Sequence, residues 1–187
     1  MTNPKMMNSG KPRIKDDDYK TIDPRCVLGL MEHFNLKDKL VIDPCSPTGS
    51  GIIEQIASHK IQCFGMPDYR LEYCCDWVIS NPPYKRPLVD DIVWDMIERL
   101  YRGGTIKDGV ALLLRTNFDH AKSREKFFEL CPNYYGQIKL LFRPTWFAKQ
   151  DGDATPFHNF VWHIWTNQDN PFLNVDFTPR VLYSEGK

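Results

Sequence analysis

The residues best suited to chemistry stand in one tetrapeptide, Asn81-Pro82-Pro83-Tyr84, which directly follows the apolar run of residues 77–80. Asn81 offers a side-chain carbonyl oxygen, and Pro82 offers a backbone carbonyl on a residue that has no N–H. Pro83 stiffens the turn, and the ring of Tyr84 offers a flat face. Two acceptors beside an aromatic ring suit a planar amino group, although a stiff turn between a strand and a helix is the structural alternative.

A second loop that could take part in chemistry follows another short apolar run, residues 39–42. It starts with Asp43-Pro44 and leads into a helical pattern that begins near Ile52. A strand, a glycine-containing loop and a helix in this order are typical of a cofactor loop, and a simple turn is the alternative interpretation. The loop contains Cys45, Ser46, Pro47, Thr48, Gly49, Ser50 and Gly51.

Hydrophobic spacing predicts the elements that position these loops. Strands are predicted at residues 39–42, 60–64, 77–80, 109–115, 135–142 and 158–166, and helices at 23–35, around 52–57, at 88–101 and at 121–130. Alternating strands and helices predict an α/β fold with a mostly parallel sheet, covering helices and right-handed crossovers. Ligands bind such sheets beyond the carboxyl ends of the strands, so residues 43–51, 65–68, 81–84 and 115–120 should share one rim.

The remaining segments indicate packing more than chemistry. The aromatic run of residues 160–165 is expected to belong to the core, and the tail after Asn167 to finish as an edge strand or an extended arm. Residues 1–18 are polar and contain no apolar signal segment, which predicts a flexible arm before a single domain of residues 19–187 in a cytoplasmic protein. No run of about 18 apolar residues predicts a membrane span.

Charge and cysteine content narrow the classes of partner. The net charge is zero, with 24 Lys and Arg against 24 Asp and Glu, which argues against a broad phosphate-binding surface. Any contact with nucleic acid must then be local, and the candidate basic groups are Lys11, Arg13 and Lys15; Lys85 and Arg86; and Lys122, Arg124 and Lys126, each of which could also be an ordinary solvated surface. The six cysteines include no Cys-x-x-Cys pair, so we expect reduced thiols and no metal site.

Taken together, residues 19–166 resemble the class I, Rossmann-like S-adenosylmethionine-dependent methyltransferases, and among them the phage-type N6-adenine DNA methyltransferases. Residues 78–84 are similar to that group's catalytic strand and its Asn/Asp/Ser-Pro-Pro-Tyr/Phe loop, and residues 41–49 to its Asp-Pro-x-x-Gly-x-Gly cofactor loop. Tyr19-Lys20-Thr21 stands where the group has a Tyr-x-Thr element that touches the cofactor. Residues 143–147, followed by the strand at 160–165, also look like the end of that group.

The resemblance implies a Rossmann-like class I methyltransferase fold, a mostly parallel twisted sheet with helices on both faces and an antiparallel closing strand. It implies methyl transfer from S-adenosylmethionine to the exocyclic amino nitrogen of adenine in DNA, without a metal. The catalytic residues would be Asn81, Pro82, Pro83 and Tyr84, and the cofactor would contact Tyr19, Thr21, Asp43, Pro44, Ser46, Thr48, Gly49 and Asp68. The implied setting is the cytoplasm of a bacterial or phage-infected host cell.

Two departures from the family pattern fall on the cofactor side. Pro47 stands where the loop should have its first glycine, and its backbone cannot donate a hydrogen bond. Pro67 stands where family members place an acidic residue for the ribose hydroxyls, with Asp68 one position later. Asp68 could reach the ribose through a bent loop, or it could be a plain turn residue.

Three functions stay open at this point. The first is the adenine methyltransferase, whose partner is DNA, with single-stranded DNA or RNA as variants. The second is a different amino-group methyltransferase, acting on guanine in RNA or on glutamine in protein, since these enzymes use a similar turn. The third is a non-catalytic pseudo-methyltransferase that serves as a binding module. The length leaves no room for a separate target-recognition domain, so recognition would be relaxed, read few bases, or depend on a protein partner or a homodimer.

Overall fold

The computed structural model describes residues 21, 23–46, 51–129, 131, 133–145, 158–167 and 180–186. The predicted flexible arm lies outside these ranges, as do Tyr19, Pro47, Thr48 and Gly49. The assignment of residues 19–187 to one domain therefore stays a prediction.

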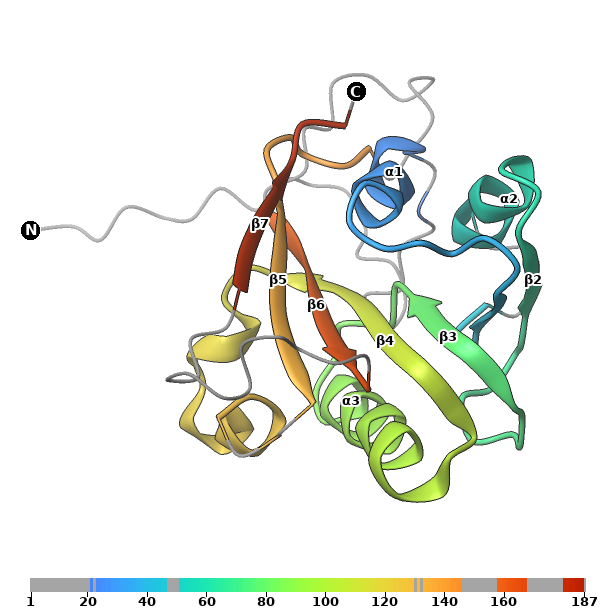
Figure 1. Ribbon diagram of the computed structural model, residues 1–187. Coiled ribbons are helices and arrows are strands. Elements are labelled where there is room, and N and C mark those ends of the chain that lie inside the picture. The colour runs from blue at the N-terminus through green and yellow to red at the C-terminus, as the bar shows by residue number, and fades with distance from the viewer. Residues whose placement is uncertain are drawn as a thin grey trace, which may run out of the picture.

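The described strands form one seven-stranded sheet in the order β2-β1-β3-β4-β6-β5-β7 (Figure 1). Neighbouring strands pair in parallel throughout, except that β6 runs antiparallel to both β4 and β5. This confirms the predicted sheet, although the antiparallel strand lies inside it and the tail supplies β7 as the edge strand. The strands are β1 Leu40–Asp43, β2 Gln62–Gly65, β3 Cys75–Ser80, β4 Ile106–Arg115, β5 Tyr134–Leu140, β6 Phe160–Thr166 and β7 Arg180–Ser184.

Helices cover both faces of this sheet, as two tryptophans of β6 demonstrate. Side chains three positions apart on a strand point to opposite faces. The Trp162 indole N–H donates to the carbonyl of Cys26 in α1, at 2.8 Å, and that of Trp165 donates to the carbonyl of Phe127, at 2.7 Å. The α-helices are α1 Arg25–Met31, α2 Gly51–Ser58 and α3 Leu88–Glu98. Two 3-10 helices, Phe118–His120 and Lys122–Phe127, contact each other, and the second also contacts α3.

The core lies between the sheet and these helices. Every residue of β6 is buried, and β4 is buried from Gly109 to Leu114, as expected for strands with both faces covered. The aromatic run of residues 160–165 is therefore core, as predicted. Close packing leaves no room at Gly109, where an added Cβ would lie 2.5 Å from the Trp77 ring.

The helix α3 follows its apolar pattern, with Val89, Ile92, Val93, Met96 and Ile97 buried on one side. A π-helical turn, Arg99–Gly103, continues it, and Gly104 then adopts a φ of 60°, a left-handed conformation that favours glycine. The predicted helix at residues 88–101 is thus confirmed.

Two predicted helices differ from the structure. The first begins at Arg25 and ends at Met31 instead of near Asn35, and Asp23 accepts a hydrogen bond from the Arg25 backbone N–H just before it, at 3.2 Å. The second, predicted at residues 121–130, is not an α-helix in its described part, since Lys122–Phe127 is a 3-10 helix. Three residues per turn place Arg124 and Phe127 on the same side, and both side chains are buried against the fold.

The described residues contain no membrane-spanning helix, no cluster of metal ligands and no disulfide. None of their helices is long and apolar enough to cross a membrane. Among the same residues no three His, Cys, Asp or Glu side chains gather as metal ligands. The six cysteines are free thiols, and burial raises the pKa of Cys75 to about 12.

Candidate active site

The loops that follow β1, β2, β3 and β4 meet at one rim of the sheet. These four strands are parallel neighbours, so their carboxyl ends lie at the same edge (Figure 1). This arrangement places Asp43–Ser46, Gly65–Asp68, Asn81–Tyr84 and residues 116–120 on the rim that the sequence predicted for them.

The loops after β1 and β2 are joined through their backbones. The Met66 N–H donates to the Asp43 carbonyl at 2.8 Å, and the Ser46 N–H donates to the Met66 carbonyl at 2.9 Å. A Cβ added at Gly65 would stand 3.0 Å from the Ser46 hydroxyl oxygen, so glycine permits this close approach. The two loops therefore form one continuous wall of the rim.

A buried hydrogen bond links this wall to the strand that carries the tetrapeptide. The Ser80 hydroxyl donates to Asp43 Oδ1 at 2.6 Å, and the Cys45 backbone N–H donates to the same oxygen at 3.1 Å. Asp43 is 2% exposed and Ser80 is fully buried. Sequence reasoning did not find Ser80, because the contact depends on the pairing of β1 with β3, which are not consecutive strands.

Within the tetrapeptide, the side chains of Asn81 and Tyr84 are hydrogen-bonded to each other. The Tyr84 hydroxyl donates to the side-chain oxygen of Asn81, and each of these residues is 7% exposed. Pro82 is buried and Pro83 is partly exposed. The acceptor that the sequence offers to an amino group is therefore satisfied internally in this conformation.

The Tyr84 ring is also covered by two residues whose contacts with it were not predicted from the sequence. The Phe160 ring lies 5.4 Å from it between centroids, and the Arg115 guanidinium lies 5.2 Å from the Tyr84 centroid. Arg115 and Phe160 are register partners between β4 and β6. Because Tyr84 is buried, a base could stack on its ring only after neighbouring side chains move.

Two hydroxyl groups near the start of the fold are buried without a described partner. Neither Thr21 Oγ1 nor Ser46 Oγ has a hydrogen-bond partner among the residues that the structure describes. The Thr21 carbonyl accepts a hydrogen bond from the Gln55 side chain in α2, at 3.0 Å. Buried hydroxyls normally find partners, so these two fit a site that receives a polar ligand.

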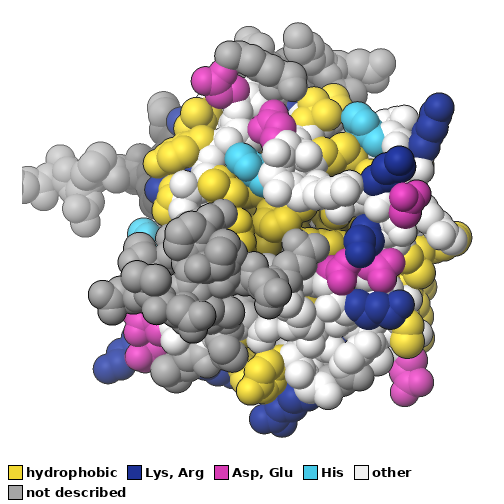
Figure 2. All heavy atoms as spheres, in the orientation of Figure 1, with side chains coloured by type: hydrophobic (Ala, Val, Ile, Leu, Met, Phe, Trp, Pro, Cys, Tyr) yellow, Lys and Arg dark blue, Asp and Glu magenta, His cyan; other side chains and the backbone are white. Residues whose placement is uncertain are grey.

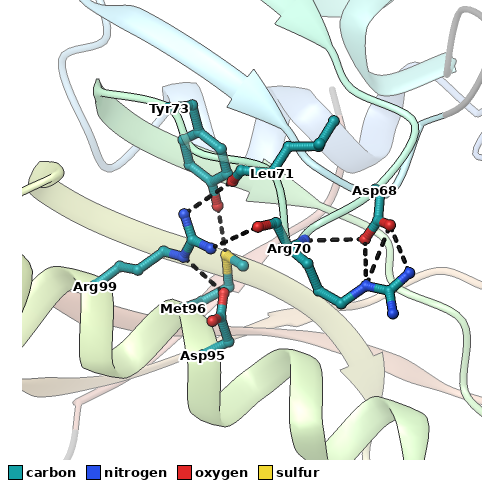
Figure 3. Close-up of polar contacts among 7 residues, drawn as sticks. All are labelled: Asp68, Arg70, Leu71, Tyr73, Asp95, Met96 and Arg99. Atoms are coloured by element: carbon teal, nitrogen blue, oxygen red, sulfur yellow. Dashed lines mark hydrogen bonds and ion pairs between the residues drawn. The ribbon is translucent and has the colours of Figure 1, made fainter.

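Asp68 lies at the start of an irregular segment, residues 66–74, and pairs with Arg70. The Arg70 guanidinium donates to Asp68 at 2.6 Å, and this hydrogen bond lowers the pKa of the Asp68 carboxyl to about 2. Arg99 anchors the same segment (Figure 3), donating to the carbonyl of Leu71 at 3.0 Å and lying 4.9 Å from the Tyr73 ring centroid. The structure thus gives Asp68 a turn role, with its carboxylate kept ionised.

Comparisons with known proteins identify structural neighbours only. No protein-family model matches the chain, and no curated protein matches it. Among solved structures, a proposed class I S-adenosylmethionine-dependent methyltransferase from Listeria monocytogenes shares 13% identity at a TM-score of 0.49, with 91% of this chain and 66% of that one covered. A mutant of Spodoptera frugiperda DNMT2 shares 13% identity at a TM-score of 0.46, with 90% of this chain and 54% of that one covered.

The overall fold is also similar to that of a proposed RNA methyltransferase from Pyrococcus horikoshii. It shares 14% identity at a TM-score of 0.51, and the match covers 87% of this chain and 92% of that one. At this identity the likeness concerns the architecture alone. Together with the mostly parallel seven-stranded sheet, it shows that this chain has the Rossmann-like fold of class I methyltransferases.

Proposed function

We propose that this chain transfers a methyl group from S-adenosylmethionine to the exocyclic amino nitrogen of adenine in DNA. The observation that carries the proposal is the complete Asn81-Pro82-Pro83-Tyr84 turn at the carboxyl end of β3, joined through Ser80 to Asp43 at the end of β1. The loop that starts at Asp43 and the turn that starts at Asn81 are therefore neighbours. Methyl transfer needs a methyl donor and a planar amino group side by side, and this rim has a loop suited to each.

The proposed cofactor residues are Tyr19, Thr21, Asp43, Pro44, Ser46, Thr48, Gly49 and Asp68. The Thr21 and Ser46 hydroxyls support this set, because both are buried without a hydrogen-bond partner among the described residues. When bound, S-adenosylmethionine would supply a methyl group on a sulfonium sulfur, so that the leaving group is a neutral thioether and the methylated amino group releases one proton.

Asp68 would serve the ribose hydroxyls as an acceptor. An aspartate carboxylate is ionised at neutral pH, Arg70 lowers the pKa of this one further, to about 2, and an ionised carboxylate accepts hydrogen bonds at both oxygens. Both Asp68 and Arg70 are partly solvent-exposed, so a ligand hydroxyl can join the pair without breaking a buried contact.

The catalytic turn would act by accepting hydrogen bonds from the substrate. The adenine amino nitrogen is a poor nucleophile because its lone pair is delocalised into the ring. The Asn81 side-chain oxygen and the Pro82 carbonyl would each accept a hydrogen bond from one of its two N–H groups. These two hydrogen bonds favour a pyramidal nitrogen and concentrate the lone pair on it. This is positioning and electrostatic preorganisation, with no covalent intermediate.

Tyr84 would move when the substrate arrives. Its hydroxyl must release Asn81 before the amino group can bind there, and because Tyr84 is buried, neighbouring side chains must move before a base can stack on its ring. A target base in a duplex must also leave its own stack. The turn is therefore proposed to exchange internal contacts for equivalent contacts with the base.

Calorimetry with S-adenosylmethionine tests the cofactor half of this proposal. The parent protein should bind, and Asp43→Ala should bind much more weakly, because it removes the carboxylate that orders the loop. Asp91→Ala, an exposed carboxylate on α3, is the matched control and should bind like the parent. No binding by the parent would exclude every methyltransferase function and leave the non-catalytic binding module.

The substrate half is tested by methyl transfer to DNA, RNA and protein side by side. The Asn81 and Pro82 acceptors suit any planar amino or amide group, so guanine in RNA and glutamine in protein are the alternatives. Preferential labelling of DNA supports the proposal. Labelling of RNA or protein alone would replace adenine in DNA with that substrate.

A further inference from the structure

The segment between β2 and β3, residues 66–74, carries the proposed ribose acceptor Asp68 and has no regular secondary structure. At its start, the Met66 N–H and carbonyl are hydrogen-bonded to the loop after β1. Near its end, the Tyr73 hydroxyl donates to Met96 Sδ in α3 at 3.0 Å, and Tyr73 is 9% exposed. Both ends of the segment are therefore attached to the fold, and Asp68 lies between them.

Arg99 holds the middle of this segment. Its Nη1 donates to the Leu71 carbonyl at 3.0 Å, and its Nη2 donates to the Arg70 carbonyl at 3.4 Å (Figure 3). Its Nε donates to Asp95 Oδ2 in α3 at 2.7 Å, which fixes the guanidinium itself. Within the part of the chain that the structure describes, every hydrogen bond that reaches residues 68–72 from outside this stretch comes from Arg99.

Arg70 connects this restraint to Asp68. Its backbone carbonyl accepts from Arg99, while its Nη2 and its backbone N–H donate to the Asp68 carboxylate at 2.6 and 3.0 Å. The Leu71 N–H also donates to the Asp68 carbonyl, at 3.2 Å, which closes the turn. The position of the Asp68 carboxylate thus depends on the Arg99 guanidinium through two backbone carbonyls.

Arg99 differs from the exposed cations of the molecule. On the face drawn in Figure 2, several Lys and Arg side chains lie next to Asp and Glu side chains on the surface, and exposed ion pairs contribute little. The Arg99 side chain is only 18% exposed, and its Cζ lies 4.9 Å from the Tyr73 ring centroid. Arg102, on the same π-helical turn, is 73% exposed and lies 3.6 Å from Glu98. Arg102 is therefore the matched comparison for Arg99.

Arg99 also lies far from the catalytic turn along the same helix. The turn leads into α3, whose 11 residues span about 16 Å, and Arg99 follows the last of them. The neighbouring Leu100 is 2% exposed, so the π-helical turn is anchored in the core. Loss of the guanidinium should therefore loosen residues 68–72 and leave Asn81–Tyr84 in place.

We propose that Arg99 is a positioning residue for the cofactor, which raises the affinity for S-adenosylmethionine by holding Asp68 in place for the ribose hydroxyls. This inference rests on the proposed function and adds a residue outside the rim. A segment that is ordered before the ligand arrives loses less conformational freedom on binding. Neither Arg99 nor Asp68 belongs to the turn proposed to hold the amino group, so the chemical step should keep its rate.

The test is calorimetry of the whole chain with S-adenosylmethionine. Arg99→Met keeps an apolar stem and removes every donor, so the Kd should rise roughly tenfold, as for the loss of one hydrogen bond to a charged group. Arg99→Lys keeps the charge without the planar fork of donors and should recover part of the affinity. Arg102→Met removes an exposed ion pair from the same turn and should bind like the parent.

Two further measurements separate positioning from a general loss of structure. In an Asp68→Ala background, Arg99→Met should change the Kd little further, because its effect passes through Asp68. In methyl transfer, Arg99→Met should raise the KM for S-adenosylmethionine and keep kcat within about twofold, since it affects binding alone. Partial unfolding would instead lower kcat together with the number of binding sites seen in calorimetry.

The outcomes distinguish this inference from the proposed function. Equal Kd values for the parent and Arg99→Met, or a further tenfold loss in the Asp68→Ala background, would overturn the inference and leave the proposed function in place if the parent methylates DNA. Affinity that depends on Arg99 and Asp68, without transfer to DNA by the parent, would support the inference and contradict the proposed substrate. Absence of S-adenosylmethionine binding by the parent would contradict both.

Discussion

Ser80 and Asp43 share a buried hydrogen bond of 2.6 Å that joins the ends of β3 and β1. The donor is a neutral hydroxyl and the acceptor is a carboxylate oxygen that also receives the Cys45 backbone N–H. The proposed cofactor loop and the proposed catalytic turn therefore share one buried polar contact. A change at Ser80 should be felt in both loops.

Ser80→Ala should lower the free energy of unfolding by about 1.5–3 kcal/mol, the usual effect of losing a buried hydrogen bond to a charged group. It should also weaken the binding of S-adenosylmethionine, because the Asp43 carboxylate loses one of its restraints. Urea unfolding and calorimetry measure the two effects. Ser58→Ala removes an exposed hydroxyl that donates to the Gln55 carbonyl in α2, so it should change neither by more than a small amount. Wild-type behaviour of Ser80→Ala in both assays would show that the contact does not couple the loops.

Substitutions at Tyr84 separate its two contacts. Tyr84→Phe removes the hydroxyl that occupies Asn81, so the ring can still stack and the KM for the nucleic acid should fall or stay constant. Tyr84→Ala removes the stacking surface, which is worth about 1–3 kcal/mol per base, and should lower kcat/KM roughly tenfold or more. Steady-state methyl transfer measures both. Equal losses in the two variants would mean that the hydroxyl, and not the ring, serves the substrate.

His163 in β6 makes stability depend on pH. It is fully buried, and burial lowers the pKa of its imidazole to about 4, below the ordinary value of 6.5. The unfolded chain then binds more protons between pH 6.5 and 4, so stability is present above this window and is lost as the pH falls through it. For this residue alone, the free energy of unfolding should fall by about 2 kcal/mol between pH 7.5 and 5.

His163→Asn is the variant that checks this dependence. Its amide oxygen can still accept a hydrogen bond from the Tyr134 hydroxyl, which lies 3.0 Å from His163 Nδ1. The variant can be less stable at every pH, yet its loss of stability between pH 7.5 and 5 should be smaller than in the parent. Urea unfolding at the two pH values gives this difference, and equal losses would assign the pH dependence to other groups.

Much of the fold could be predicted from hydrophobic spacing because strands and helices alternate along the chain. The continuous apolar run in β4 and the aromatic run in β6 correctly indicated buried strands. The position of β6 between β4 and β5 could not be predicted, since strand order depends on contacts between distant segments. The 3-10 helix Lys122–Phe127 was also missed, because Arg124 acquires its role only through Asp90 and Phe118.

The same division applies to the candidate site. Asp43 and Asn81 could be placed on one rim because each directly follows a predicted strand. Their connection through Ser80, and the cover that Arg115 and Phe160 provide for Tyr84, depend on strand pairing and could not be read from local patterns. Sequence patterns therefore indicated the loops, whereas tertiary contacts determine how the loops are held.

The most direct test of the central claim is transfer of a tritiated methyl group from S-adenosylmethionine to adenine-containing DNA, followed by digestion to nucleosides. The parent should place the label in N6-methyldeoxyadenosine. Asn81→Ala should abolish transfer while S-adenosylmethionine still binds in calorimetry, because it removes an acceptor for the substrate and leaves Asp43 in place. Absence of label from adenine with the parent, or loss of cofactor binding together with transfer in Asn81→Ala, would contradict the roles proposed for this rim.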